Sequence, residues 1–230
     1  MSIEPGFSRI LNDVVWNCWK RHAESNPDRE AIIHWNAKLP PFRWTRGKLF
    51  ERAYSYANKL KELGVAEGDV CAIMFRHHKE FYPLYLAVIA LGALPSVIHY
   101  PNPRLHPDKF RQGLQGMARR SGLDWIITEQ ELESILHPLL YDQENTIRGV
   151  LFPLAGGNNL PADGTFHIVH PPTTPDSPCF LQHSSGTTGL QKAVVISNRA
   201  VLQNVYHVSE STLLTNEDKV VSWLPLYHDM

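Results

Sequence analysis

Apolar residues repeat with two different periods along this chain. Runs of roughly four to eight mostly apolar residues bounded by turn residues are typical of strands, and they occur at 31–35, 41–44, 68–75, 95–100, 124–129, 149–154, 179–184 and 192–197. Longer segments carry apolar residues at helical spacing, and these lie at 7–25, 46–63, 79–94, 106–122, 130–140 and 198–212. From residue 68 the two kinds of segment alternate, which predicts an α/β fold of mostly parallel sheets flanked by helices.

Several of the predicted helices have recognisable ends. Asn26-Pro27 closes the first one, because proline cannot continue a helix. Thr45 is placed to cap the next helix with its hydroxyl, and Gly64 is placed to stop it. Arg119 and Arg120 end the helix at 106–122, where cations suit the helix dipole and face solvent.

A region rich in Gly, Pro, Asn, Asp and Thr interrupts the alternation at residues 155–178. It contains one possible strand, 166–170, and otherwise resembles a connecting stretch. This predicts a first α/β subdomain at 1–154, the connecting stretch at 155–178, and the start of a second, truncated subdomain at 179–230.

Composition narrows the possible partners. The 22 Lys and Arg nearly balance the 23 Asp and Glu, so there is no overall field to attract nucleic acid or an acidic membrane. The longest apolar stretch, 81–94, falls short of the roughly 20 residues that span a bilayer. The N-terminus lacks the pattern of a signal peptide, and three distant cysteines do not form a disulfide framework. We therefore predict a cytoplasmic protein without an integral membrane segment.

A candidate anion-binding segment lies between two predicted strands. It consists mostly of glycines and residues with small hydroxyl side chains, and it ends in a lysine. Glycines let backbone N–H groups converge on an anion, hydroxyls donate further hydrogen bonds, and a lysine adds a charge-assisted one. The candidate phosphate-binding residues are Ser184, Ser185, Gly186, Thr187, Thr188, Gly189 and Lys192. An ordinary hairpin turn is the alternative.

Other kinds of site are less well supported. The segment is not a Walker loop, because two residues separate Gly189 from Lys192 and a strand follows in place of a helix. Neither H-E-x-x-H nor C-x-x-C occurs, so no protein-built metal site is expected. Four aromatic residues are expected in the core and not on a base-stacking surface, namely Trp16, Trp19, Phe42 and Trp44.

The segment "SSGTTGLQK", 184–192, resembles the phosphate-binding signature of the adenylate-forming superfamily, which includes acyl-CoA synthetases and fatty-acyl-AMP ligases. The segment "DKVVSWLPLYHDM", 218–230, is similar to the next motif of that family, and its "PLYHDM" is most like the fatty-acyl-AMP ligases. Residues 42–74 and 86–104 also resemble the family. Motifs in the correct order are more specific than either alone.

The resemblance implies a two-step reaction in which a carboxylate attacks the α-phosphate of ATP, and a thiol then takes the acyl group from the adenylate. Ser184–Gly189 would wrap the β- and γ-phosphates, with Lys192 alongside. His228 would lie at the mouth of the acyl pocket, with Trp223 and Tyr227 lining it. The implied substrates are ATP and a carboxylic acid, most simply a fatty acid. The acceptor would be an acyl carrier protein or coenzyme A, and Mg²⁺ would have its ligands mostly beyond residue 230.

The sequence departs from the family signature at Gln191, Ala193 and Asn198, where proline, glycine and histidine are usual. Because the chain stops inside a motif, at Met230, we expect an N-terminal fragment, the first part of the large N-terminal domain of an adenylate-forming enzyme. Such a fragment holds no complete catalytic set and is expected to be inactive alone. The alternative is a non-catalytic nucleotide-binding or interaction module derived from that family.

Overall fold

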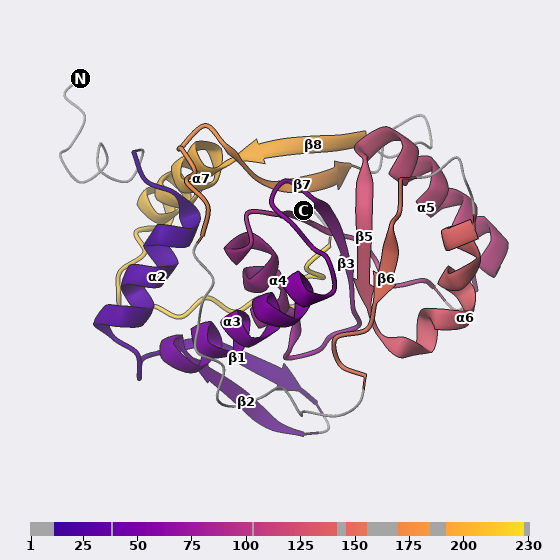
Figure 1. The fold of residues 1–230 in the computed structure, drawn as a ribbon. Helices are drawn as coiled ribbons and strands as arrows, with labels where there is room; N and C mark the ends of the chain where they lie inside the picture. The colour runs from indigo at the N-terminus through magenta and orange to yellow at the C-terminus, as the bar shows by residue number, and fades with distance from the viewer. Residues whose placement is uncertain are drawn as a thin grey trace.

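A six-stranded sheet forms the centre of the molecule, with helices on both of its faces (Figure 1). The structure is a computed structural model that describes residues 12–37, 39–102, 104–141, 146–155, 170–184 and 192–227. The strands of the sheet lie in the order β6-β5-β3-β4-β7-β8. All neighbours are parallel except β7 and β8, which confirms the predicted α/β fold.

The secondary-structure elements follow the predicted segments closely. The central strands are β3 (Val70–Met74), β4 (Leu94–Val97), β5 (Leu123–Thr128), β6 (Gly149–Leu151), β7 (Pro178–Ser184) and β8 (Lys192–Ser197). A separate antiparallel hairpin consists of β1 (Glu30–Asn36) and β2 (Leu39–Thr45). The helices are α2 (Val15–Ser25), α3 (Arg46–Glu62), α4 (Phe81–Ala90), α5 (Pro107–Ser121), α6 (Glu133–Leu136) and α7 (Asn198–Thr212), and 3-10 turns at 130–132 and 137–141 flank α6.

The two faces of the sheet carry separate cores. On one face α3 and α4 pack against side chains that include Ile73 of β3. On the other face α5 and α6 pack against side chains that include Ala72 and Met74 of the same strand. Consecutive residues of a strand point to opposite faces, so a strand covered on both sides must be apolar throughout. This explains the continuous apolar run of β3.

Helix ends form as the sequence predicts. The Thr45 hydroxyl accepts a hydrogen bond from the Lys48 amide at 3.3 Å at the start of α3. After that helix, Gly64 has a φ of +102°, which a glycine adopts without the steric cost of a Cβ. Arg119 and Arg120 lie exposed in the last turn of α5. These predictions are confirmed.

The first helix begins later than predicted. It starts at Val15, and Val14 before it is extended, with φ −119° and ψ 149°. The Asp13 carboxylate accepts a hydrogen bond from the Val14 amide at 2.8 Å, a local contact that competes with helix formation. The prediction was therefore wrong for residues 12–14, and residues 7–11 of the same segment lie outside the described part.

One of the four aromatic residues assigned to the core is exposed. Trp16 and Trp44 are buried and Phe42 is half-buried, as predicted. Trp19 remains 37% exposed. The face of α2 that carries Trp19 has less protein packed against it than the face that carries Trp16, and helical spacing alone could not distinguish the two faces.

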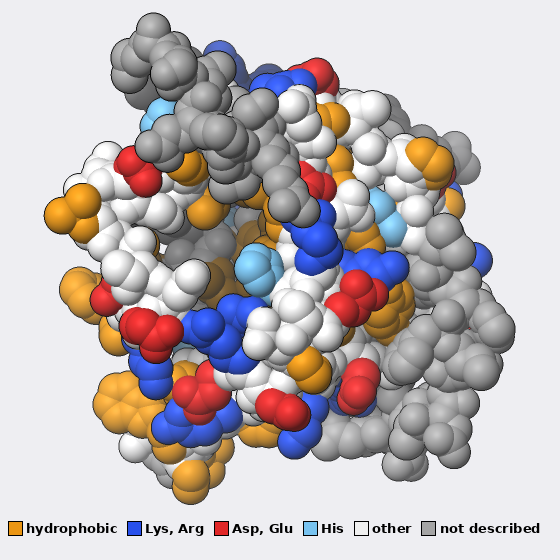
Figure 2. Space-filling model, turned by 90° about the vertical axis from the view of Figure 1, so that its left-hand side faces the viewer, with side chains coloured by type: hydrophobic (Ala, Val, Ile, Leu, Met, Phe, Trp, Pro, Cys, Tyr) orange, Lys and Arg blue, Asp and Glu red, His pale blue; other side chains and the backbone are white. Residues whose placement is uncertain are grey.

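The last two strands extend the same sheet as the strands before residue 155, through pairing of β4 with β7. The division at 155–178 stays a prediction, and the possible strand at 166–170 lies outside the described residues except for His170. Within the described part no helix is both long enough and apolar enough to cross a membrane. On the face drawn in Figure 2, Lys and Arg side chains alternate with Asp and Glu, as the balanced composition predicts.

Candidate functional site

The carboxyl edge of the sheet has the topology of a ligand site. The chain leaves β3 toward α4 on one face, and it leaves the neighbouring β4 toward α5 on the other face. The two connections diverge there, and ligands of open parallel sheets bind in the crevice that such a divergence creates. The loops at 75–80 and 98–106 therefore frame the candidate site.

The hairpin of β7 and β8 brings both ends of the predicted phosphate-binding segment to this edge. Strand β7 is parallel to β4, so the two strands end on the same side of the sheet. Ser184, the last residue of β7, is paired with Lys192, the first residue of β8. Lys192 is exposed. The segment joins two strands, as the sequence predicts, and Ser185, Gly186, Thr187, Thr188 and Gly189 lie outside the described residues.

Of the three residues predicted to line the acyl pocket, one lies at the carboxyl edge of the sheet. The Tyr227 ring lies 6.2 Å from the ring of His99, which follows β4, so Tyr227 reaches the same carboxyl edge. Trp223 is 88% exposed. His228 lies outside the described residues. The structure thus places Tyr227 near the candidate site, and the pocket role of all three residues stays a prediction.

A groove of about 200 Å³ lies beside His99, between the end of β4 and α5. Five apolar side chains line it together with His99, Lys109, Gln112 and Arg120, and Gly113 and Gly116 leave open space on the α5 side. Burial lowers the pKa of His99, which favours a neutral imidazole. A second cavity, of about 330 Å³, lies beside Trp16 and His170, away from the ends of β7 and β8.

Arg76 ties the strand ends of the edge together, and sequence patterns did not identify it. Its guanidinium lies over the Tyr100 ring at 4.7 Å and donates a hydrogen bond to the Tyr100 hydroxyl at 3.0 Å. The same side chain forms ion pairs with Glu129 and Glu131 after β5. Arg76 therefore connects the ends of β3, β4 and β5. No local motif marks these residues, because each lies in a different loop.

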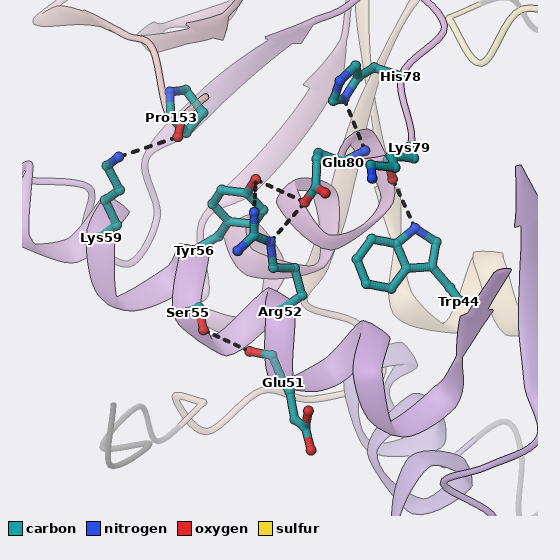
Figure 3. Close-up of polar contacts among 10 residues, drawn as sticks. All are labelled: Trp44, Glu51, Arg52, Ser55, Tyr56, Lys59, His78, Lys79, Glu80 and Pro153. Atoms are coloured by element: carbon teal, nitrogen blue, oxygen red, sulfur yellow. Dashed lines mark hydrogen bonds and ion pairs between the residues drawn. The ribbon is translucent and has the colours of Figure 1, made fainter. Parts of the chain in front are cut away.

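A buried polar network holds the loop between β3 and α4 (Figure 3). Figure 3 shows the Glu80 carboxylate accepting hydrogen bonds from Arg52 at 2.9 Å and from the Tyr56 hydroxyl at 3.0 Å, both on α3. The Lys79 carbonyl accepts a hydrogen bond from the Trp44 indole at 3.1 Å. Since Glu80 and Tyr56 are buried, their polar atoms need these partners. The network fixes the loop that frames one side of the candidate site.

Metal binding has no support in the described part of the chain. No group of three or more His, Cys, Asp or Glu side chains comes together there in a way that could hold a metal ion. At the end of β7, the carboxyl edge has the cation Lys192 beside a strand end that leads into glycines and hydroxyls. Chemically, this arrangement can hold an anion.

Known proteins resemble this chain in sequence and in fold. Residues 19–230 match the sequence model of the AMP-binding enzyme family. An acetyl-coenzyme A synthetase of Phycomyces blakesleeanus is 28% identical, over 83% of this chain and 31% of its own. A long-chain-fatty-acid–CoA ligase of Thermus thermophilus is also 28% identical, over 81% of this chain and 34% of its own.

A solved fatty acyl-adenylate ligase from L. pneumophila has the same fold, with a TM-score of 0.79 at 19% identity. The similarity covers 100% of this chain and 38% of that one. The chain thus spans about a third of the length of these relatives. The resemblance that the motifs predicted is confirmed by the match over residues 19–230: the chain belongs to the AMP-binding enzyme family.

Proposed function

We propose that this chain forms the phosphate-binding part of an ATP-dependent ligase that activates a carboxylic acid as an acyl-adenylate. The observation that carries the proposal is the pairing of Ser184 with Lys192 at the carboxyl edge of the sheet. This pairing puts both ends of the family's phosphate-binding segment where parallel sheets bind ligands.

The roles of the segment follow from its chemistry. Backbone amides of Ser185–Gly189, with the Ser184, Thr187 and Thr188 hydroxyls, would bind the β- and γ-phosphates of ATP. Lys192 would place a positive charge beside them. As the acid attacks the α-phosphate, negative charge builds on the departing pyrophosphate, and fixed donors that stabilise this charge lower the barrier.

On the acid side, the groove between β4 and α5 supports a substrate with an apolar part, because five of the eleven residues that line it are apolar. The contact of Tyr227 with His99 lies next to this groove. We propose a fatty acid as the substrate, with Tyr227, Trp223 and His228 around its reacting end. The thiol acceptor is coenzyme A, as in the names of the curated relatives, or an acyl carrier protein.

The described residues fit one of the two implied ligands. The phosphates of ATP fit an exposed lysine beside a strand end. For Mg²⁺, the described ranges contain no ligand cluster, so we assign it no residue and no step. When bound, Mg²⁺ would neutralise phosphate charge.

Two measurements on the 230-residue chain test the proposal. Calorimetry with ATP and with inorganic pyrophosphate measures phosphate binding, and mass spectrometry after incubation with ATP and decanoate or acetate measures acyl-AMP. Binding together with an acyl-AMP product supports the ligase. Since the chain spans about a third of the length of its relatives, binding without product agrees with a ligase as well as with a nucleotide-binding module, and the same product assay on the chain extended to its natural stop codon then separates the two. The absence of phosphate binding refutes the proposal.

A further inference from the structure

Strand β7 is joined to the rest of the sheet by little backbone pairing. Its register with β4 consists of one pair, Ser96 with Leu181. Strand β4 ends at Val97, and β7 continues to Ser184. Toward its carboxyl end, β7 therefore has β8 beside it on one side and only a short parallel neighbour on the other.

The side chain of His183 supplies the missing connection. Its Nδ1 lies 2.7 Å from the Ser96 hydroxyl on β4, and its Nε2 lies 2.9 Å from the Ser121 hydroxyl at the end of α5. His183 is 8% exposed and Ser96 is fully buried. One imidazole thus links three elements, β7, β4 and α5, immediately before Ser184.

The protonation state of His183 allows it to form both hydrogen bonds at once. Burial lowers the pKa of His183, so its ring is neutral near pH 7. A neutral imidazole has one donor nitrogen and one acceptor nitrogen, and a serine hydroxyl can take either role. Both hydrogen bonds therefore form with either tautomer. The contact with Ser96 is buried and the contact with Ser121 is partly buried, and low exposure to water strengthens such hydrogen bonds.

We propose that His183 is a positioning residue, which holds the carboxyl end of β7 and thereby the first residue of the phosphate-binding segment. The second half of this inference rests on the proposed function. Binding groups must be held to within fractions of an ångström, and rigid elements with hydrogen-bonded supports achieve this better than loops do. Ser184 is such a group, and His183 is its immediate neighbour.

Substitutions that remove the two hydrogen bonds one at a time test the proposal. In His183→Asn the amide reaches only the Nδ1 position, next to Ser96; in His183→Gln it reaches the Nε2 position, next to Ser121. His183→Phe keeps a ring and loses both contacts. Ser121→Ala removes one partner, and Ser55→Ala, which removes a hydroxyl that donates a hydrogen bond to the Glu51 carbonyl within α3, is the matched control.

Two readouts separate support of the strand end from general stability. Amide hydrogen exchange measured by NMR reports the order of residues 182–184 and 192–194, and calorimetry reports affinity for inorganic pyrophosphate. We expect His183→Phe to speed exchange there by about tenfold and to weaken pyrophosphate binding by about tenfold, the equivalent of one or two buried hydrogen bonds. His183→Asn, His183→Gln and Ser121→Ala should have smaller effects, and Ser55→Ala none.

The outcomes are distinct. Exchange and affinity in His183→Phe equal to those in Ser55→Ala would overturn the proposal, and so would lower thermal stability with unchanged pyrophosphate affinity. If His183→Phe does not fold, Ser121→Ala decides by the same two readouts. If the wild-type chain binds no pyrophosphate, the proposed function fails, and exchange alone decides whether His183 holds the end of β7.

Discussion

Ser184 and Lys192 face each other across β7 and β8, so the two ends of the segment between them lie side by side in the sheet. A segment closed by strand pairing has its two ends at a fixed separation. The backbone of Lys192 is consequently held beside Ser184, at the start of the glycine and hydroxyl run. This relationship makes Lys192 the most direct test of the site.

Lys192→Ala should weaken pyrophosphate binding by about ten- to a hundredfold, because hydrogen bonds to charged groups contribute about 1.5–3 kcal/mol. Since Lys192 is exposed, the melting temperature should change little. Calorimetry measures the affinity, with Lys48→Ala on α3 as the control for loss of an exposed lysine. Equal affinities in the two variants would remove Lys192 from the site.

The Arg52–Glu80 ion pair should matter much more for stability than the Arg43–Glu30 pair. The side chains of the first pair are 20% and 6% exposed, and those of the second are 54% and 37% exposed. Removing one member of a buried pair leaves an uncompensated charge, so Glu80→Ala should lower the free energy of unfolding by about 3 kcal/mol. Arg43→Ala should lower it by less than about 1 kcal/mol. Urea unfolding at pH 7 compares them, and similar losses would contradict the prediction.

Two glycines should respond in opposite directions to alanine. Gly92 has a φ of +71°, and a Cβ there would lie 2.3 Å from Cγ of Pro171. Gly92→Ala should therefore cost about 2 kcal/mol or more of unfolding free energy. Gly113 lies within α5, and a Cβ there would meet nothing within 4 Å, so Gly113→Ala should stabilise by about 0.5–1 kcal/mol. Thermal unfolding of both variants checks the signs.

His34 should make the protein less stable in mild acid. It is 7% exposed and its ring stacks on that of His77, with centroids 4.0 Å apart. Burial, followed by the nearby charges of His77, His78 and Lys79, lowers the pKa of His34 from 6.5 to about 4. Between these values the unfolded chain binds a proton that the folded one does not. Stability present above pH 6.5 is thus lost as the pH falls toward 4.

Urea unfolding at pH 7 and pH 4.5 tests this prediction. The wild type should lose about 2 kcal/mol more of unfolding free energy between these pH values than His34→Phe, which cannot titrate. His207→Gln, at an exposed position on α7, is the control and should behave like the wild type. A parallel loss in His34→Phe would show that other groups cause the acid sensitivity.

Element types and ends could be predicted because they depend on neighbouring residues. The Thr45 cap acts three residues along the chain, and the strands flanking the phosphate-binding segment contain their own apolar runs. The order of the strands could not be predicted, since an apolar run carries no record of its neighbour in the sheet. For the same reason the contact between Arg76 and Tyr100 at the candidate site could not be predicted.

The role of His183 could not be predicted from the sequence. Its partners, Ser96 and Ser121, lie 87 and 62 positions away along the chain. In the sequence it is one of twelve histidines, and only its position next to the phosphate-binding segment distinguishes it. The late start of α2 has a local cause in Asp13, yet the apolar spacing around it continues without interruption.

The single pairing of Ser96 with Leu181 also bears on how the chain folds. These residues are separated by 85 positions, counted from 96 to 181, which exceeds the separation in every other strand pairing of the described residues. Contacts between residues far apart in the sequence form slowly, because a long loop must close first. We therefore expect β3 to β6 to assemble early, and the β7–β8 hairpin to dock last. The two ends of the phosphate-binding segment would then reach the carboxyl edge of the sheet only in the last step of folding.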